Sequence, residues 1–301
     1  MAEPYILHMI SPLRQMSPFD VNMALDAGFD HVLTYTHVEV SEVRALVQDA
    51  MFSRPPKLAR RTGIFFGGKN AVLALAMMEA AKEAMFPPFQ LSLFADPAGS
   101  FTTGAAMVAC VERVLKEKKQ RSLAGLGVAI FGATGVVGFA AGVICALEGA
   151  KVTLVGYDGP DRVARVATEI KKRFNLDVAS ADGSSEEKKT EILKSAEAAF
   201  CTAKAGLQIL SKQQVDAAPS LLVAADVNAV PPTGVEGLDM KANGQEIGAK
   251  GALGIGPLAI GDIKYKTESG LFRAMIAAEK AVAFDFRDAF ELARKLVSGN
   301  G

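Results

Sequence analysis

The sequence predicts an α/β protein of two domains, each with a mostly parallel sheet flanked by helices. Short segments rich in β-branched and apolar residues alternate with segments of helical spacing, as is typical of parallel strands connected by helices. A charged and then Gly-containing segment, Lys116–Gly127, interrupts this alternation and indicates a domain boundary. The length of 301 residues suits two domains of roughly 100–200 residues each. We therefore expect a first domain over residues 1–120 and a second over residues 121–268.

The first domain is predicted to contain four strands, which the β-forming runs place at residues 5–7, 31–34, 63–66 and 90–94. Apolar residues at helical spacing predict three helices between them, over residues 19–27, 40–50 and 70–85. A fourth helix is expected over residues 103–116, with Thr102 as its N-cap and lysines near its C-terminal end, where the helix dipole favours positive charge.

The second domain is predicted to contain five strands, at residues 128–131, 152–155, 176–179, 198–202 and 221–225. Helices are expected between them, over residues 135–147, 161–174, 185–195 and 211–217. After Pro231 and Pro232 the chain becomes Gly-rich, and we expect a segment there that is not regular throughout. A helical pattern begins at about Ser269, and this C-terminal helix, residues 269–301, is expected to pack back on the first domain.

Composition excludes several classes of function. The 33 basic and 33 acidic side chains balance, which does not favour a nucleic-acid partner. No apolar run reaches the roughly 18–20 residues that span a bilayer, and the N-terminus lacks the pattern of a secretory signal, so we expect a cytoplasmic protein. The three cysteines, Cys110, Cys145 and Cys201, lie far apart in apolar segments and are predicted to be buried, unpaired residues of a reducing compartment.

The sequence also lacks the signatures of metal sites and hydrolases. The three histidines have no metal-ligand spacing, so no metal is expected. There is no G-x-S-x-G motif and no G-x-x-x-x-G-K-[ST] motif, so a hydrolase or a nucleoside triphosphatase would lack its essential parts.

The most specific motif is a glycine-containing turn that directly follows the predicted strand at residues 128–131. It consists of Gly132, Ala133, Thr134, Gly135, Val136, Val137 and Gly138, and it opens a predicted helix, which is the context of a dinucleotide-binding turn. Gly135 lets the backbone approach a pyrophosphate, and Gly138 permits close packing of helix on strand. The motif departs from G-x-G-x-x-G because Ala133 replaces the first glycine. We expect a Rossmann-like second domain that binds a nicotinamide dinucleotide.

The sequence leaves the choice of dinucleotide open. Asp158 lies about where a carboxylate that binds the adenosine ribose is expected, and it would repel the 2′-phosphate of NADP. Arg162, which follows shortly, would attract that phosphate. Asp158 also has the alternative role of a turn residue before Gly159 and Pro160. NAD, NADP or both are therefore permitted.

Other polar groups are predicted at the carboxyl ends of strands, where ligands bind in open α/β sheets. Thr202 and Ala203 follow the fourth strand of the second domain, where small residues leave room for a ribose. Asp226 and Asn228 follow the fifth strand and are candidates for cofactor contacts, with loop capping as the alternative for each.

Three polar segments of the first domain end strands or open helices: residues 17–20, 67–70 and 94–103. The third is rich in hydroxyls and turn residues between an apolar strand and an apolar helix. Each segment is compatible with capping as well as with ligand binding, and Asp20 and Lys69 are the stronger candidates for contacts.

These segments, together with residues 226–232, resemble the methylene-tetrahydromethanopterin dehydrogenases of methylotrophic bacteria, particularly the type that accepts both NAD and NADP. The resemblance covers essentially the whole chain. It implies oxidation of a one-carbon unit carried on tetrahydromethanopterin during formaldehyde oxidation. It also implies a homo-oligomer, such as a trimer or hexamer, with an active-site cleft between the two domains.

Within this resemblance, the reaction removes hydride from a methylene bridge and leaves a methenyl cation, so no general base is required. The protein has to hold the carbon roughly 3–3.5 Å from the nicotinamide and stabilise positive charge. Asp20 or Asp96 is expected to supply negative potential, and Lys69 to bind a pterin oxygen or a carboxylate. The other candidates for substrate contacts are Phe19, Ser100, Thr102, Thr103 and, less directly, Lys264.

Three alternatives are compatible with the same residues. A dehydrogenase of methylene-tetrahydrofolate would differ only in the carrier. A two-domain dehydrogenase of hydroxy or amino acids would use Lys69 and Asp96 as a proton-transferring pair. A non-enzymatic dinucleotide sensor would have no need for the polar strand ends of the first domain.

Overall fold

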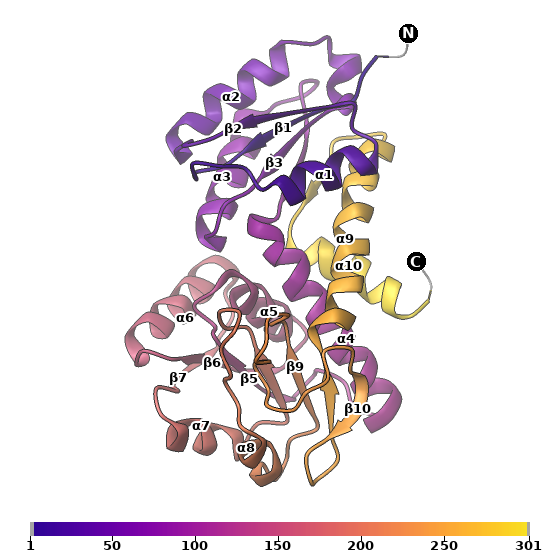
Figure 1. The fold of residues 1–301 in the computed structure, drawn as a ribbon. Coiled ribbons are helices and arrows are strands. Elements are labelled where there is room, and N and C mark those ends of the chain that lie inside the picture. The colour runs from indigo at the N-terminus through magenta and orange to yellow at the C-terminus, as the bar shows by residue number, and fades with distance from the viewer. Residues whose placement is uncertain (1–2, 300–301) are drawn as a thin grey trace. The chain divides into compact units, whose positions relative to one another are not determined.

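The computed structural model describes residues 3–299, and the chain divides into two compact units, which are described separately. The first unit ends at Thr102 and includes Tyr265–Leu292; the second comprises Thr103–Lys264 and the residues from Ala293 onward. Both units have parallel-dominated sheets flanked by helices, so the predicted α/β class is confirmed (Figure 1). Helix α4 (Ser100–Lys119) crosses the division at Thr102. The charged and Gly-containing segment from Lys116 onward therefore begins near the end of this helix, after the division.

The first unit contains a five-stranded sheet of order β12-β4-β3-β1-β2, in which every neighbouring pair is parallel. Its strands are β1 (Ile6–Ile10), β2 (His31–Tyr35), β3 (Thr62–Phe66), β4 (Ser92–Ala95) and β12 (Ala283–Phe284). Its helices are α1 (Pro18–Ala27), α2 (Val40–Phe52), α3 (Ala71–Ala84) and the 3₁₀ turns η1 (Pro56–Arg61) and η2 (Pro97–Gly99). The four strands and three helices predicted between residues 5 and 94 are confirmed.

An aromatic cluster forms the core of the first unit. Phe272, in helix α9 (Pro257–Ala277), packs against Phe65 and Phe94 of neighbouring strands, with ring centroids 5.5 and 5.1 Å apart. A Cβ at Gly63 would lie 2.7 Å from the Cε of Met275, so α9 rests directly on β3. Burial of aromatic rings contributes much of the stability of such cores.

The second unit contains a seven-stranded sheet of order β10-β11-β9-β8-β5-β6-β7, parallel except for the β10–β11 pair. Its strands are β5 (Gly127–Phe131), β6 (Lys151–Gly156), β7 (Ala179–Asp182), β8 (Ala198–Cys201), β9 (Val223–Asp226), β10 (Asn243–Ile247) and β11 (Ala252–Ile255). Its helices include α5 (Val136–Leu147), α6 (Pro160–Phe174), α7 (Glu186–Leu193) and α8 (Lys212–Ala217). Helix α10 (Phe286–Val297) contributes its last turn and a half. The order of β7, β6, β5, β8 and β9 is that of a dinucleotide-binding domain.

Three expectations about the elements are wrong. The strand expected at residues 176–179 lies three residues later, as β7. Helix α4 begins at Ser100, so Thr102 lies within its first turn and is not its N-cap. The helix expected from about Ser269 onward is two helices: α9 begins at Pro257 and ends at Ala277, and α10 follows from Phe286. The Gly-rich segment is irregular between residues 231 and 242 and then contains β10, β11 and the start of α9, so it is not regular throughout, as expected.

All three cysteines are free and buried, as predicted. Burial raises the pKa of the Cys110 thiol to about 12 and also raises the pKa values of the Cys145 and Cys201 thiols. Thiols of this kind are protonated and unreactive at neutral pH.

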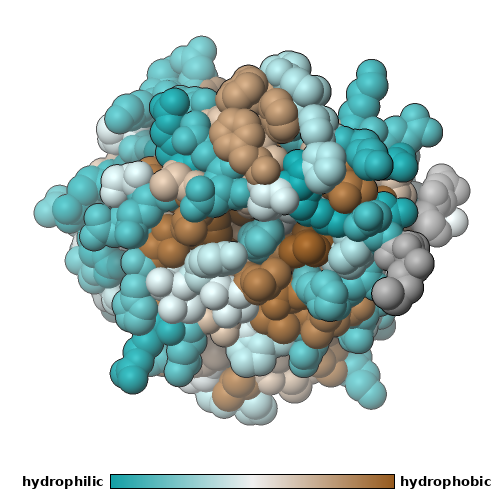
Figure 2. All heavy atoms as spheres, turned by 90° about the horizontal axis from the view of Figure 1, so that it is seen from above, coloured by the Kyte–Doolittle hydropathy of each residue, from teal (hydrophilic) through white to brown (hydrophobic). Residues whose placement is uncertain are grey.

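The surface is mixed in character. Figure 2 shows charged and polar side chains over most of one face, with several apolar patches between them. One exposed apolar group in the first unit is an aromatic cluster of Phe52, Phe86 and Phe89, whose rings lie 5.3–6.1 Å apart. Among residues 3–299, no helix combines the length and the apolar character that crossing a bilayer would require.

A partly buried ion network ties the C-terminal helix to the second unit. Arg294 of α10 donates hydrogen bonds to both carboxylate oxygens of Glu112 in α4, at 2.8 and 3.0 Å. Its Nη2 also donates to Glu148, at the C-terminus of α5, at 2.5 Å. One guanidinium therefore neutralises two carboxylates from helices far apart in the sequence.

Replacing Arg294 by Ala is expected to lower the free energy of unfolding by about 1–2 kcal/mol, because two partly buried carboxylates lose their shared partner. Urea denaturation measures this change. Lys171→Ala, which removes an exposed pair with Asp177, is the control and should cost less than about 0.5 kcal/mol. Equal losses in the two variants would contradict the proposed importance of the network.

Candidate active site

The glycine turn between β5 and α5 is built by close contacts with the loop that follows β8. Gly132 has a φ of 81°, and a Cβ there would lie 2.6 Å from the amide nitrogen of Ala203. A Cβ at Gly138 would lie 2.7 Å from the Cα of Ala133 and 2.8 Å from the Oγ1 of Thr202. These two glycines are therefore required for packing.

Gly135 differs from the other two glycines of the turn. It is exposed, it is the N-cap of α5, and its φ of −83° is accessible to any residue. The nearest atom to a Cβ there would be the carbonyl oxygen of Gly132, at 3.3 Å. A Cβ at this position would need only a small shift of that carbonyl, whereas it would occupy the space in which a ligand approaches the positive end of the helix dipole.

A hollow of about 320 Å³ lies beside this turn. Its walls come from the turn, from the end of β6 and from the loop after β8, and they are mostly apolar. Lys204 supplies an exposed ammonium, whereas the ammonium of Lys189 pairs with Glu186 at 2.5 Å and donates to the carbonyl of Ile209 at 2.8 Å. An apolar hollow with an exposed ammonium and a helix N-terminus suits an adenine ring attached to phosphates.

The structure brings five of the predicted cofactor residues to this hollow: Gly132, Thr134, Gly135, Thr202 and Ala203. Ala133 is buried, and Val136, Val137 and Gly138 belong to the first turn of α5 without lining the hollow. Lys189 was not predicted, because it comes from the middle of α7 and only the fold brings it here. Lys204 carried a usable signal, since it lies in the loop that begins after β8 ends at Cys201.

Asp158 and Arg162 form an exposed ion pair beside the hollow. The Nη1 of Arg162 donates to Asp158 at 2.7 Å and to the hydroxyl of Tyr157 at 3.1 Å. These bonds raise the pKa of the Arg162 guanidinium. Tyr157 lines the hollow, but Asp158 and Arg162 do not. The carboxylate expected to bind a ribose is therefore partly neutralised by an arginine of the helix that follows it, α6.

Asp226 and Asn228 organise the loop after β9 and do not line the hollow. Asp226 accepts the amide of Asn228 at 2.9 Å and that of Gly234 at 2.6 Å. Burial raises the pKa of its carboxyl, although these N–H groups oppose the change. Asn228 accepts the amides of Gly206 and Val230 and donates to the carbonyl of Pro232. The geometry is that of loop capping, the alternative that the sequence left open for both residues.

The first unit has a hollow of about 450 Å³ at the carboxyl ends of its strands. Its walls come from the loop after β1, from the start of α1, from the turn after β3 and from η2. Asp20 and Lys69 both line it, as expected of substrate contacts. The volume falls within the roughly 300–1,000 Å³ of small-molecule sites.

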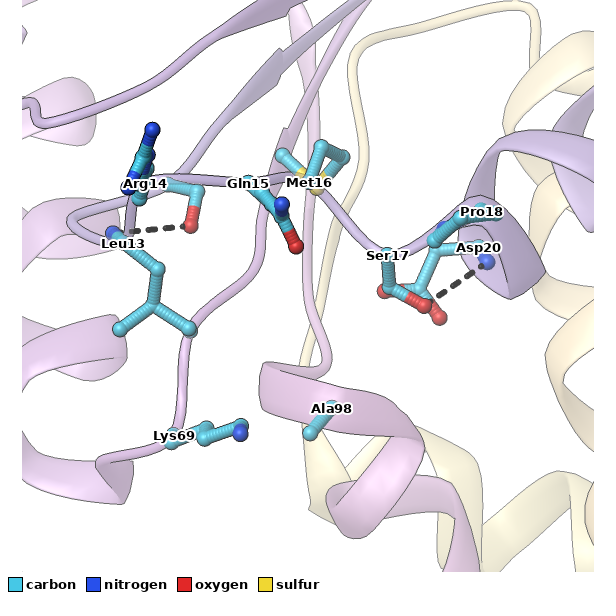
Figure 3. Close-up of a pocket in the computed structure, with 11 residues that line it drawn as sticks. Leu13, Arg14, Gln15, Met16, Ser17, Pro18, Asp20, Lys69 and Ala98 are labelled. Carbon is cyan, nitrogen blue, oxygen red and sulfur yellow. Dashed lines mark hydrogen bonds between the residues drawn. The ribbon is translucent and has the colours of Figure 1, made fainter.

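Polar groups of different character surround this hollow. Figure 3 shows the side chains of Gln15 and Lys69 pointing toward the space between the loop and the turn, with the carboxylate of Asp20 beside Ser17. Asp20 is almost completely buried, whereas Lys69 and Gln15 are exposed. Arg14, Gln15 and Ser11 were not predicted, because the segment after β1 has no distinctive spacing. The site offers a carboxylate, an amide and an ammonium to one ligand.

Asp96 does not line this hollow but caps helix α4. Its buried carboxylate accepts the amides of Phe101 and Thr102, at 2.8 and 3.3 Å, and the hydroxyl of Thr102 at 2.5 Å. Phe19, Ser100 and Thr102 also lie outside the lining, and Thr103 and Lys264 belong to the second unit. Within residues 3–299 no group of side chains has the composition of a metal site.

Comparisons with known proteins agree with this geometry. The family described as methylene-tetrahydromethanopterin dehydrogenase, N-terminal, matches residues 18–98. An NAD(P)-dependent methylenetetrahydromethanopterin dehydrogenase of Methylorubrum extorquens is 50% identical over 288 residues, which cover 96% of this chain and 97% of the relative. The bifunctional protein MdtA of the same organism is 32% identical over 284 residues, 93% of this chain and 94% of the relative.

Solved structures support the fold. Quinate dehydrogenase from Corynebacterium glutamicum, in complex with NAD, aligns with a TM-score of 0.52 at 14% identity, covering 98% of this chain and 99% of that protein.

The three glycines of the turn should separate binding from folding. Gly135→Ala is expected to weaken binding of NAD and NADP about tenfold or more while changing the free energy of unfolding by less than about 1 kcal/mol. Gly138→Ala should instead lower the free energy of unfolding by about 1–3 kcal/mol, because its Cβ has no space. Calorimetric titration and urea denaturation measure the two effects; unaltered affinity in Gly135→Ala would exclude the turn as the phosphate site.

Proposed function

The chain belongs to the methylene-tetrahydromethanopterin dehydrogenase family, and we propose that it transfers hydride from methylene-tetrahydromethanopterin to NAD or NADP. The product is methenyl-tetrahydromethanopterin, and the reaction serves formaldehyde oxidation. The observation that carries this proposal is the similarity to the NAD(P)-dependent relative along nearly the whole length of both chains. Each unit has a hollow at the carboxyl ends of its parallel strands, which supports the proposal because the reaction has two small-molecule reactants.

The second unit has the features needed to bind the dinucleotide, whose nicotinamide ring supplies the hydride acceptor when bound. Gly135 leaves space for the pyrophosphate at the N-terminus of α5, where the helix dipole favours negative charge. Lys204 adds a positive charge at the same hollow. The apolar wall around Val155 and Ile209 suits the adenine ring.

The first unit has the features needed to bind the pterin. Oxidation of the methylene bridge leaves a cation, so the reaction requires stabilisation of positive charge and no proton transfer at the reacting carbon. Asp20 provides a buried negative charge at the hollow, where low solvent exposure strengthens electrostatic attraction. Lys69 and Gln15 offer hydrogen-bond donors to pterin oxygens. In this proposal Asp96 acts indirectly, by capping the helix that follows.

Use of both NAD and NADP is supported by the pair of Asp158 and Arg162. With Arg162 beside it, the Asp158 carboxylate repels a 2′-phosphate less than a lone carboxylate would. Released from the pair, Arg162 offers two donors to a phosphate, and Asp158 offers acceptors to ribose hydroxyls. We further propose a homo-oligomer that works in the cytoplasm, a reducing compartment that suits three free cysteines.

The central experiment supplies purified protein with methylene-tetrahydromethanopterin and measures the absorbance of NADH or NADPH. Formation of both reduced dinucleotides is expected. Methylene-tetrahydrofolate, tested in parallel, should react more slowly. No reduction with the methanopterin carrier would overturn the proposed function, and faster reduction with the folate carrier would change the substrate.

Asp20→Asn is expected to lower kcat about 10- to 100-fold, because the variant keeps the shape of the side chain but loses its charge. The dissociation constant for NAD should be unchanged, since the dinucleotide hollow belongs to the other unit. Asp26→Asn is the matched control, as it removes an exposed carboxylate from the same helix outside the hollow. Equal kcat values in the wild type and Asp20→Asn would refute the electrostatic role.

Arg162→Ala is expected to raise the KM for NADP about tenfold and to leave the KM for NAD nearly unchanged, because only NADP carries the 2′-phosphate. Asp158→Asn should instead raise the KM for NAD and leave the KM for NADP nearly unchanged. Arg165→Ala, on the same helix, removes a guanidinium that bonds the carbonyl of Asp161 and serves as the control. Initial rates with each dinucleotide test this, and parallel changes in both KM values would argue against a role in selection.

A further inference from the structure

One wall of the dinucleotide hollow is formed by the loop after β8, residues 203–209, whose backbone cannot be held by the sheet itself. Ala203, Lys204, Leu207 and Ile209 of this loop all line the hollow. Lys204 and Leu207 are exposed, and of the four only Ile209 packs against the core, so burial of apolar surface contributes little to fixing the middle of the loop. Its position has to come from hydrogen bonds to neighbouring segments.

The loop after β9 supplies bonds at two places. In the middle of the wall, the amide of Gly206 donates to the Oδ1 of Asn228 at 3.0 Å. At its far end, the amides of Ile209 and Leu210 donate to the carbonyl of Gly234, at 2.8 and 2.9 Å. The far end is also held by Lys189 of α7, whose ammonium donates to the carbonyl of Ile209 at 2.8 Å, so Asn228 is the side chain that holds the middle.

Asn228 is suited to hold the middle attachment. It is 4% exposed, and all of its amide atoms are engaged: Oδ1 also accepts the amide of Val230 at 2.9 Å, and Nδ2 donates to the carbonyl of Pro232 at 2.7 Å. Its own amide nitrogen is held by Asp226, whose second oxygen holds Gly234. Asp226 therefore anchors both attachments, and Asn228 extends one of them to the wall.

We propose that Asn228 is a positioning residue for the dinucleotide, which fixes the wall at residues 203–209 without touching the ligand. The inference rests on the proposed function for the identity of the ligand. If the wall is already ordered before binding, the binding free energy does not have to include the entropy cost of ordering the wall. Loss of the Gly206 bond should therefore weaken binding.

Asn228→Ser removes the Gly206 bond and the donation to Pro232 but keeps one bond of the loop. A serine hydroxyl can still accept the amide two residues on, that of Val230, but is too short to reach Gly206. The dissociation constant for NAD is expected to rise about tenfold, and hydrogen exchange of residues 203–210, measured without ligand, should become faster. Asn228→Ala, which also loses the Val230 bond, should show an equal or larger rise.

Thr233→Val is the matched control. It removes a hydrogen bond of the same loop, from the hydroxyl to the carbonyl of Val235 at 2.7 Å, and leaves the Gly206 bond intact. Its affinity for NAD and its exchange at residues 203–210 should match those of the wild type. Calorimetric titration with NAD and with AMP, which contacts only the adenine side, would provide the binding data.

The outcomes are distinguishable. Wild-type affinity and wild-type exchange in Asn228→Ser would overturn the positioning role while leaving the proposed function standing. Equal losses of affinity in Asn228→Ser and Thr233→Val would also overturn it, since they would indicate general loosening of the loop. A wild-type protein that binds neither NAD nor NADP would overturn the proposed function together with the inference.

Discussion

Parallel strands end in backbone groups that the sheet no longer pairs, and these groups must find partners wherever a ligand hollow opens beside them. In the second unit, Thr202 continues the ladder by donating its amide and its hydroxyl to the carbonyl of Phe131. Beyond Thr202, side chains accept the backbone amides of the loops: the carboxylate of Asp226 accepts that of Asn228, and the side-chain amide oxygen of Asn228 accepts that of Gly206. The hollow can stay open because side chains of the loops, rather than a filled core, satisfy the backbone.

In both units an aspartate at the end of a strand accepts the backbone amides of the loop that follows. Asp96 follows β4 in the first unit, Asp226 ends β9 in the second, and both carboxylates are fully buried acceptors of backbone amides. An ionised carboxylate that accepts several N–H bonds is a strong acceptor, so one residue can fix a whole turn. Such aspartates resemble ligand contacts in sequence because they stand at the carboxyl ends of strands. Their distance from the hollow becomes clear only in three dimensions.

Elements that depend on the spacing of nearby residues could be predicted from the sequence. The strands and helices through α8 could be predicted from alternation and apolar spacing, except for the position of β7, whose residues are not apolar. The turn at Gly132–Gly138 could be predicted from its strand–turn–helix context. Strand β11 and the start of α9 could not, because Gly256 serves a contact with residues near 240 rather than a loop. Likewise, Lys189 and Gln15 reach the hollows by tertiary placement, which one sequence without its fold does not specify.

The three cysteines have a practical consequence. Each is buried, and burial keeps each thiol protonated at neutral pH, so none competes for reagents that attack exposed thiolates. A cysteine introduced at an exposed position, such as Ala205→Cys beside the dinucleotide hollow, would be the fast-reacting thiol of the chain. Fluorescent labelling at this position could then follow occupancy of that hollow without removal of a native cysteine.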